Sequence, residues 1–378
     1  MIYLDHAAAT PVSKKALDAM LPYFTDDFFN PSAAYLSAKK VRAAYEDAKD
    51  RIAHCIGAKG TDIVITSGAT EANNLAFTAA ESKILLLETE HDSVLNVAKN
   101  YDYELIKVDK TGTIDLADFK KKLTHDVAFV SVSLANNELG TIQPLAEVAE
   151  IIRAEKSIRL KNGISTPLYF HTDASQALNL IDVSVARLGV DLLTLNSAKV
   201  YGPKGVGALY VSHDVKLKPI SYGGGQENGL RSGTENVPAT IGFAAALEEA
   251  KKHLAGNRKK YEKLVQILHK ELEKSVVKPT FLGGKHTLAN FCAVTFPGID
   301  AERLIYKLED QEIYVSTGAA CAASKGKKSH VLKAIGLNDT EIAGSLRLSL
   351  GELNNEADIR AAAAAINQAI KEEYERTK

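Results

Sequence analysis

The chain has 378 residues, and 46 lysines and arginines stand against 47 aspartates and glutamates, which gives a formal net charge of -1. These charges form no long block of one sign, so the sequence indicates neither a nucleic-acid-binding nor a membrane-binding surface. Apolar runs such as "IGFAAAL" are far shorter than the ~20 residues of a membrane span. The first residues show no signal peptide, and 3 cysteines make no disulfide framework. Together these features predict a cytoplasmic protein.

Helical patterns alternate with short strand-like runs from about residue 35 onward. The helical patterns occupy residues 35–57, 72–80, 92–100 and 144–156, and the strand-like runs occupy residues 62–66, 83–88, 103–108, 126–134, 167–173, 191–197 and 207–211. This alternation predicts an α/β fold with a mostly parallel, mixed sheet that helices cover on both faces. Ligands bind to such a sheet at the carboxyl ends of its strands.

A second folding unit is expected after the sheet, because the chain is longer than one core usually requires. A long helical stretch at roughly 239–275 leads out of the sheet, and it is followed by a strand at 290–298, a helix at 301–311, a loop rich in Gly, Ala and Ser, and a closing Ala-rich helix. The sequence therefore predicts a large domain at 15–255 and a smaller α+β domain at 256–378, joined by an N-terminal segment at 1–14.

Lys199 follows an expected strand and lies in the turn "SAKVYGPKG", which glycines and a proline constrain. A lysine at a strand end is more often a solvated surface group. However, an amine that is held above a sheet can be activated as a nucleophile toward a carbonyl group, and pyridoxal phosphate is the cofactor that most often recruits such an amine. The turn therefore raises the hypothesis of a pyridoxal-phosphate site.

Asp173 meets the next requirement of that cofactor. The pyridine nitrogen has to stay protonated, which requires a carboxylate, and Asp173 ends the expected strand before the lysine turn. The alternative role of Asp173 is to cap a helix that we expect to begin at "ASQALNL". Gln176 would lie on the same face of this helix and could reach the phenolic oxygen of the cofactor.

The run "DIVITSGATEANNLAF" predicts a strand, a Ser-Gly turn and a helix whose first turn contains Ala69 and Thr70. Free N–H groups and the helix dipole favour an anion at such a position, and the Thr70 hydroxyl adds a donor. The spacing does not match G-x-G-x-x-G, so the argument for a phosphate site depends on its agreement with Lys199 and Asp173.

His91 and Asn137 also follow expected strands. His91 could lay its ring on the cofactor and move protons near neutral pH, although a surface histidine near a helix start is the simpler interpretation.

Cys55 and Cys292 lie in apolar patterns that indicate burial. Cys321 lies in the small-residue loop "STGAACAASKGKKS", where exposure and neighbouring lysines favour the thiolate. No metal site is expected.

Several segments resemble, in chain order, the motifs of the NifS/IscS-type cysteine desulfurases of the class V aminotransferase family. They are "YLDHAAATP", "SGATEANN", "TEH", "NNELGT", "HTDASQ", "AKVYGPKGVGALYV", "GGGQENGLRSGTEN", "STGAACAAS" and "SLRLSLG", and they cover nearly the whole chain. The resemblance implies the aspartate aminotransferase-like fold of type I pyridoxal-phosphate enzymes, a homodimer, and conversion of L-cysteine to L-alanine with a persulfide left on the enzyme. It also implies a sulfur-acceptor protein that serves iron–sulfur cluster assembly or tRNA thiolation.

The resemblance also implies a role for each matching residue. Lys199 would hold the cofactor as an imine and move the α-proton of the substrate, and Cys321 would accept the sulfur. Asp173 would pair with the pyridine nitrogen, Gln176 with the phenolic oxygen, and His91 would stack on the ring. Thr234 would contact the phosphate bound by the other subunit, and Asn137 and Arg347 would bind the substrate carboxylate. Within one chain, we expect Ala69 and Thr70 to bind the phosphate together with Asn196 and Ser197 of the lysine turn.

The lysine turn departs from the pattern of the family, which usually has Ser-x-His-Lys where this chain has Asn196, Ser197, Ala198 and Lys199. Asn196 keeps an amide donor and Ser197 could substitute as a donor, but Ala198 cannot donate. A charge-assisted hydrogen bond contributes ~1.5–3 kcal/mol. We therefore expect weaker retention of the cofactor without loss of activity.

Three alternatives stay open at the level of the sequence. A selenocysteine lyase or an aminotransferase of the same fold would not need Cys321. A non-catalytic pyridoxal-phosphate-binding scaffold for sulfur transfer would tolerate the altered lysine turn. Arg347, in the alternating run "SLRLSLG", could be a strand residue that points to solvent.

Overall fold

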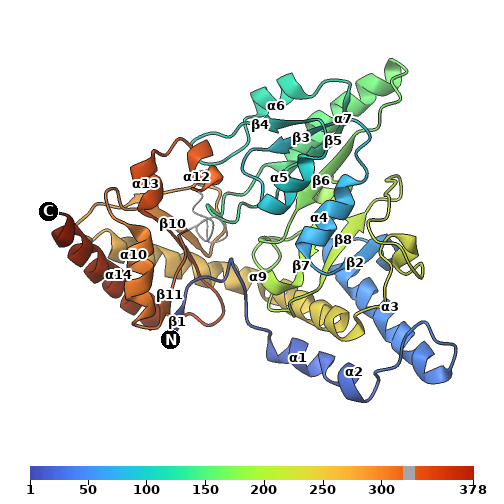
Figure 1. Cartoon of the computed structure of the whole chain (residues 1–378), viewed down its shortest axis with the longest axis horizontal. Helices are drawn as coiled ribbons and strands as arrows, with labels where there is room; N and C mark the ends of the chain where they lie inside the picture. The colour runs from blue at the N-terminus through green and yellow to red at the C-terminus, as the bar shows by residue number, and fades with distance from the viewer. Residues whose placement is uncertain (318–327) are drawn as a thin grey trace.

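The computed structural model describes residues 1–317 and 328–378. A seven-stranded sheet forms the centre of its larger part (Figure 1). The strands are β2 (Ile63–Thr66), β3 (Lys83–Leu87), β4 (Tyr103–Ile106), β5 (Val127–Ser131), β6 (Tyr169–Asp173), β7 (Leu192–Asn196) and β8 (Gly207–Val211). They are ordered β2-β8-β7-β6-β5-β3-β4, and β8 is antiparallel to both of its neighbours while the remaining pairs are parallel. The prediction of a mostly parallel, mixed sheet is confirmed.

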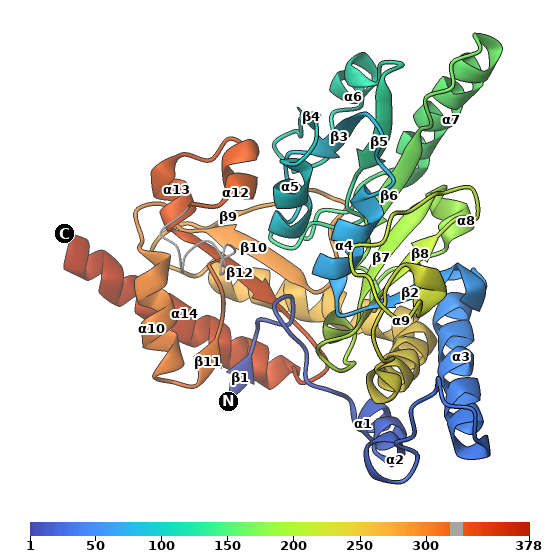
Figure 2. The same ribbon diagram turned by 45° about the vertical axis from the view of Figure 1, so that its right-hand side comes forward.

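Helices cover both faces of this sheet (Figure 2). Alternate residues of a strand point to opposite faces, so Ile63 and Ile65 of β2 pack into one core cluster and Val64 packs into another. The first cluster includes residues of α3 (Leu36–Ile56), α7 (Leu145–Lys161) and α9 (Val237–Leu272), and the second includes residues of α4 (Ala69–Phe77) and α5 (Asp92–Ala98). Strands with both faces buried explain the nearly continuous apolar runs in the sequence.

The smaller part contains an antiparallel sheet of order β12-β10-β9, packed against α10 (Ala301–Glu309) and α14 (Glu356–Thr377). Its strands are β9 (Thr280–Phe281), β10 (Phe291–Thr295) and β12 (Ser345–Ser349). The N-terminal strand β1 (Ile2–Tyr3) pairs with β11 (Ile313–Tyr314), so the first residues lie beside this part (Figure 1).

Helix α9 belongs to both parts of the structure. Its buried residues up to Ala250 pack with the large core, whereas Tyr261, Leu264, Leu268 and Leu272 pack with the small one. This change of core along α9 supports a domain boundary near residue 255, which we retain as a proposal.

The remaining helices are α1 (Lys14–Met20), α2 (Pro22–Thr25), α6 (Leu116–Lys122), α8 (Val185–Leu188), α12 (His330–Ala334) and α13 (Asp339–Ala343). Within the described ranges, no helix combines the length and the apolar character that crossing a membrane requires.

The helix expected directly after Asp173 is absent, and that prediction was wrong. Residues 175–180 form successive turns, and the next helix is α8. The backbone N–H of Ala174 still donates to the Thr194 carbonyl of the neighbouring strand, and the carboxylate of Asp173 accepts from the Ser175 N–H. Because these bonds keep the backbone attached to the sheet, Asp173 does not cap a helix, and Gln176 lies in a turn.

Candidate active site

The carboxyl ends of three neighbouring strands lie at one edge of the sheet. β5 pairs with β6 and β6 with β7, and Asp173 is opposite Thr194 in the register. Asp173 is the last residue of β6, and Lys199 lies in the single helical turn η2 (Ser197–Lys199) that follows β7. Asn137 lies in the loop that follows β5. The expected amide, carboxylate and amine therefore come from adjacent strands.

The N-terminal segment holds Lys199. The Lys199 Nζ atom donates to the carbonyl oxygens of Ala7 at 2.8 Å and Ala8 at 2.5 Å. Gln176 donates from Nε2 to the same Ala7 oxygen at 3.1 Å. Lys199 and Gln176 are thus brought together by an N-terminal carbonyl group, which the sequence reasoning did not assign to the site.

Asp173 is buried, and hydrogen bonds orient both of its carboxylate oxygens. Oδ1 accepts from the Ser175 N–H at 2.9 Å, and Oδ2 accepts from Nδ2 of Asn73 at 2.9 Å. The same Asn73 nitrogen donates to Ser93 Oγ at 2.9 Å, and Ser93 Oγ lies 2.9 Å from Nδ1 of His91. A chain of hydrogen bonds therefore connects Asp173 to His91, whose side chain is exposed at the start of α5.

Two fully buried titratable groups lie close to Asp173. Burial raises the pKa of Glu90 to about 8, and the Asp173 carboxylate acts in the same direction. Burial lowers the pKa of His171 to about 4, although the Asp173 charge opposes this shift. Near neutral pH, His171 is therefore uncharged and Glu90 is mostly protonated.

Replacing Glu90 with glutamine is expected to change how stability depends on pH. Because the pKa of Glu90 is raised on folding, its contribution to stability is complete below the unfolded pKa of about 4.3 and is lost as the pH rises toward 8. Between pH 6.5 and 8.5, the wild-type apoprotein should lose about 2 kcal/mol of unfolding free energy that Glu90→Gln does not lose. Urea unfolding at several pH values measures this difference, and parallel pH profiles for the two proteins would contradict the assignment.

Arg347 is only 4% exposed, so it is not a strand residue that points to solvent. Its Nη1 atom donates to the carbonyl oxygen of Asn137 at 2.9 Å, and its Nη2 atom donates to Oδ1 of Asp5 at 2.6 Å. Asp5 precedes Ala7 and Ala8 by only a few residues. One N-terminal segment therefore contacts both the expected cofactor lysine and the expected substrate arginine.

An anion site is expected at the start of α4. Gly68 precedes the helix and offers no side-chain cap to its first N–H groups. Ala69 is half-buried and Thr70 is exposed. A Cβ atom on Gly207 of β8 would come within 2.8 Å of the Gly68 backbone, so glycine is required there for β8 to pack against this turn.

The altered residues of the lysine turn lie in different surroundings. Asn196 is half-buried, and its Oδ1 accepts from the Ala198 N–H at 3.3 Å. Ser197 is fully buried, and its Oγ lies where a Cβ atom on Gly202 would collide with it. Ala198 is half-buried, so its side chain keeps some exposure to solvent.

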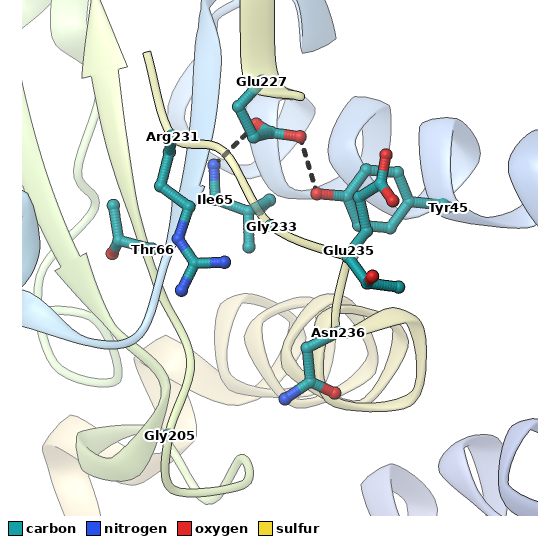
Figure 3. A pocket seen from close by; sticks show the side chains of 10 residues that line it. Tyr45, Ile65, Thr66, Gly205, Glu227, Arg231, Gly233, Glu235 and Asn236 are labelled. Atoms are coloured by element: carbon teal, nitrogen blue, oxygen red, sulfur yellow. Dashed lines mark hydrogen bonds between the residues drawn. The ribbon is translucent and has the colours of Figure 1, made fainter. Parts of the chain in front are cut away.

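Thr234 is exposed and lines a cavity of about 160 Å³ between α3, β2 and the loop at 221–236 (Figure 3). The buried carboxylate of Glu227 fixes this loop, because it accepts from the Tyr45 hydroxyl at 2.6 Å, from Lys49 Nζ at 3.1 Å and from the Ile65 N–H at 2.8 Å. Within this chain, Thr234 is thus held on an ordered loop.

The cysteines separate as expected where the structure describes them. Cys55 and Cys292 are both buried, and burial raises the pKa of both thiols, that of Cys55 to about 11. Neither suits a role as a nucleophile near neutral pH. Cys321 lies outside the described residues. No cluster of His, Cys, Asp and Glu side chains suited to a metal ion occurs in residues 1–317 or 328–378.

Comparisons with known proteins identify the family of this chain. The family model described as aminotransferase class-V matches residues 2–361. The cysteine desulfurase IscS 1 of Archaeoglobus fulgidus is 40% identical over 373 residues, which cover 95% of this chain and 94% of that protein.

Two solved structures share the fold as well. A NifS-like protein matches with a TM-score of 0.89 and 32% identity over 98% of this chain and 99% of that one. SspA in complex with cysteine matches with a TM-score of 0.78 and 32% identity over 93% of this chain and 99% of that one. The prediction of a type I fold is confirmed, and the chain belongs to the class V aminotransferase family, together with the IscS-type cysteine desulfurases.

Proposed function

We propose that this chain is a pyridoxal-phosphate-dependent cysteine desulfurase, which takes sulfur from L-cysteine, releases L-alanine and leaves a persulfide on Cys321. The observation that carries the proposal is the arrangement of Asp173 and Lys199 at the carboxyl ends of two neighbouring strands, in a chain that is 40% identical to a cysteine desulfurase. The related structure of SspA with cysteine supports L-cysteine as the substrate. A cytoplasmic sulfur-acceptor protein is part of the same proposal.

The residues at the sheet edge fit the three functional groups of the cofactor. Lys199 offers an amine to the aldehyde, Asp173 offers an oriented carboxylate to the pyridine nitrogen, and the uncapped start of α4 offers N–H donors to the phosphate. Bound pyridoxal phosphate would supply an electron sink for negative charge that develops on the substrate carbons.

The chain's own side chains would then bind the substrate and move protons. Lys199 Nζ would take the proton from the α-carbon of the substrate, and the Ala7 and Ala8 carbonyls would hold the amine whenever it is free. Gln176 would donate to the phenolic oxygen, and the exposed ring of His91 would stack on the cofactor. The hydrogen bonds from Asn73 and Ser175 keep the Asp173 carboxylate in one orientation, so that it would not have to reorient during turnover.

Arg347 and Asn137 would bind the carboxylate of the substrate. The guanidinium already pairs with the Asp5 carboxylate, so its buried position suits a carboxylate oxygen. Asn137 is its immediate neighbour through a backbone hydrogen bond. Arginine suits this role because its planar fork can form two parallel bonds with one carboxylate.

Cys321 would receive the sulfur. Its thiolate would attack the sulfur of the bound substrate, so that a sulfur–sulfur bond forms as the carbon–sulfur bond breaks. The electron pair of the broken bond stays with the substrate carbon, which gains a proton and leaves as alanine. A thiolate is the required nucleophile, and the buried Cys55 and Cys292 do not provide one.

A homodimer would complete the site, with Thr234 contributing to the phosphate site of the partner. Large apolar side chains are exposed near the start of the chain: Leu17, Leu21, Phe24, Phe28, Tyr35 and Leu36. Such a group of exposed apolar residues is typical of a protein interface. We propose a second copy of this chain as the protein that covers them.

Replacing Ala198 with histidine is expected to strengthen cofactor binding. The new ring would restore the donor that the family usually carries before the lysine, and Ala198 keeps some exposure that leaves room for it. One charge-assisted bond corresponds to roughly a tenfold or greater decrease in the dissociation constant. Titration of apoprotein with pyridoxal phosphate measures the change, and equal affinity would mean that another donor already serves the phosphate.

Borohydride trapping tests the proposed chemistry at Lys199. Reduction of the loaded protein should fix a pyridoxyl group on Lys199, which peptide mapping identifies. A label on another lysine, or no label after incubation with excess cofactor, would refute the proposed site.

A further inference from the structure

Asn73 and Ser93 lie between the two side chains that the proposed function assigns to the ring of the cofactor. Asn73 is fully buried on α4, and its Nδ2 atom donates to Asp173 Oδ2 and to Ser93 Oγ, both at 2.9 Å. Ser93 Oγ continues to His91 Nδ1 at 2.9 Å. A single amide group and a single hydroxyl group therefore join a strand end to the start of α5.

The direction of each hydrogen bond follows from the groups involved. The Asp173 carboxylate can only accept, so the Asn73 amide must turn its nitrogen toward it; Asn73 Oδ1 is buried without a hydrogen-bond partner among the described residues. His91 Nδ1 accepts from the backbone N–H of Ser93 at 3.0 Å, so this nitrogen carries no proton. The Ser93 hydroxyl, which accepts from Asn73, must then donate to His91.

The direction of these hydrogen bonds determines which nitrogen of the neutral His91 ring carries the proton. With Nδ1 occupied as an acceptor, the neutral ring carries its proton on Nε2, the nitrogen that is not held by α5. The same chain holds Oδ2 of Asp173 in place. The two groups are therefore connected by a chain of hydrogen bonds that runs from the buried Asn73–Asp173 bond to the exposed Ser93–His91 bond.

We propose that Asn73 and Ser93 are positioning residues that couple His91 to Asp173. The four side chains would form one hydrogen-bonded unit, in which His91 stacks on the face of the cofactor ring and Asp173 pairs with its pyridine nitrogen. This inference rests on the proposed function. Asn73 and Ser93 need not touch the cofactor. They act through the orientation of His91 and Asp173.

A double-mutant cycle on cofactor affinity tests the coupling. Ser93→Ala is expected to raise the dissociation constant of pyridoxal phosphate about fivefold and Asn73→Ala about tenfold, because each loses about one or two hydrogen bonds of the unit. If the chain acts as one unit, the double variant should bind as Asn73→Ala does, instead of showing the product of both effects. Independent, multiplying effects would overturn the proposal.

Two variants separate positioning from general stability. Ser93→Thr keeps the hydroxyl and should retain wild-type affinity, whereas Asn96→Ala, at an exposed position of the same helix, should change nothing. The visible circular dichroism of the bound cofactor should fall in Ser93→Ala and not in Ser93→Thr. An equal loss in both Ser93 variants would contradict a role for the hydroxyl.

The apoprotein provides a test that does not depend on the cofactor. The nitrogen NMR signals of His91 should report the Nε2–H form, and the Nδ1 signal should shift in Ser93→Ala and also in Asn73→Ala, although Asn73 does not contact His91. A shift in Ser93→Ala alone would overturn the coupling. Failure of the wild type to bind pyridoxal phosphate would refute the proposed function, and this NMR result would still decide whether the bridge exists.

Discussion

Lys199→Ala is expected to abolish covalent attachment of pyridoxal phosphate and to lower turnover of L-cysteine by at least about a thousandfold. The amine of Lys199 is the group that the N-terminal carbonyls hold at the sheet edge, and alanine leaves no side chain there to bond the aldehyde or to move the α-proton. Absorbance of the bound cofactor and sulfide release measure the two effects separately.

Lys204→Ala is the matched control for this variant. Lys204 lies in the same connection between β7 and β8 and is exposed. Its replacement should leave the cofactor and turnover unchanged. The account of Lys199 fails if Lys199→Ala still yields a cofactor that borohydride can fix to the protein.

Cys321→Ser is expected to stop sulfide release, by about a thousandfold or more, while the protein still binds pyridoxal phosphate through Lys199. A hydroxyl group is a much weaker nucleophile than a thiolate toward the sulfur of cysteine. Cysteine should still change the absorbance of the bound cofactor, because Arg347 and Asn137, the residues proposed to bind its carboxylate, remain in place. Sulfide release and the cofactor spectrum can be followed in the same sample.

Cys55→Ala serves as the control, because burial raises the pKa of this thiol to about 11 and keeps it protonated near neutral pH. This variant should retain turnover, provided that its folded fraction matches the wild type. Full activity of Cys321→Ser, or loss of activity only in the Cys55 variant, would exclude Cys321 as the sulfur acceptor.

Helices and strands that are specified by short stretches of sequence were predicted well. The apolar runs that became β5, β6 and β7 form buried strands of a mostly parallel sheet, as predicted, with Asp173 at the end of β6 and Lys199 just after β7. The helix predicted at 35–57 is found as α3. Short-range sequence patterns predict such elements because a helix forms its backbone hydrogen bonds within itself and a strand forms them with a neighbouring strand.

Features that depend on contacts between distant residues were not predicted. The helix expected after Asp173 is replaced by turns, because Ala174 keeps a backbone bond to Thr194 that no local pattern reveals. The roles of Asp5, Ala7 and Ala8 depend on an N-terminal segment that packs beside residues nearly 200 or more positions away. The "YLDHAAATP" motif was the available signal, but it carried no chemistry of its own.

The bridge through Asn73 and Ser93 was missed for a related reason. Both residues lie in helices, where polar side chains usually face solvent, and only the packing of α4 against α5 and β6 brings them between Asp173 and His91. Charged or catalytic residue types attract notice in a sequence, whereas a buried amide that orients them does not. Such residues become visible once the partners of each site atom are identified.

The most direct test of the proposed activity is product analysis with L-cysteine. Wild-type protein loaded with pyridoxal phosphate, supplied with L-cysteine and an excess of a thiol reductant, is expected to form L-alanine and sulfide in equal amounts over many turnovers. Formation of a keto acid in place of alanine, or release of sulfide without alanine, would contradict the account.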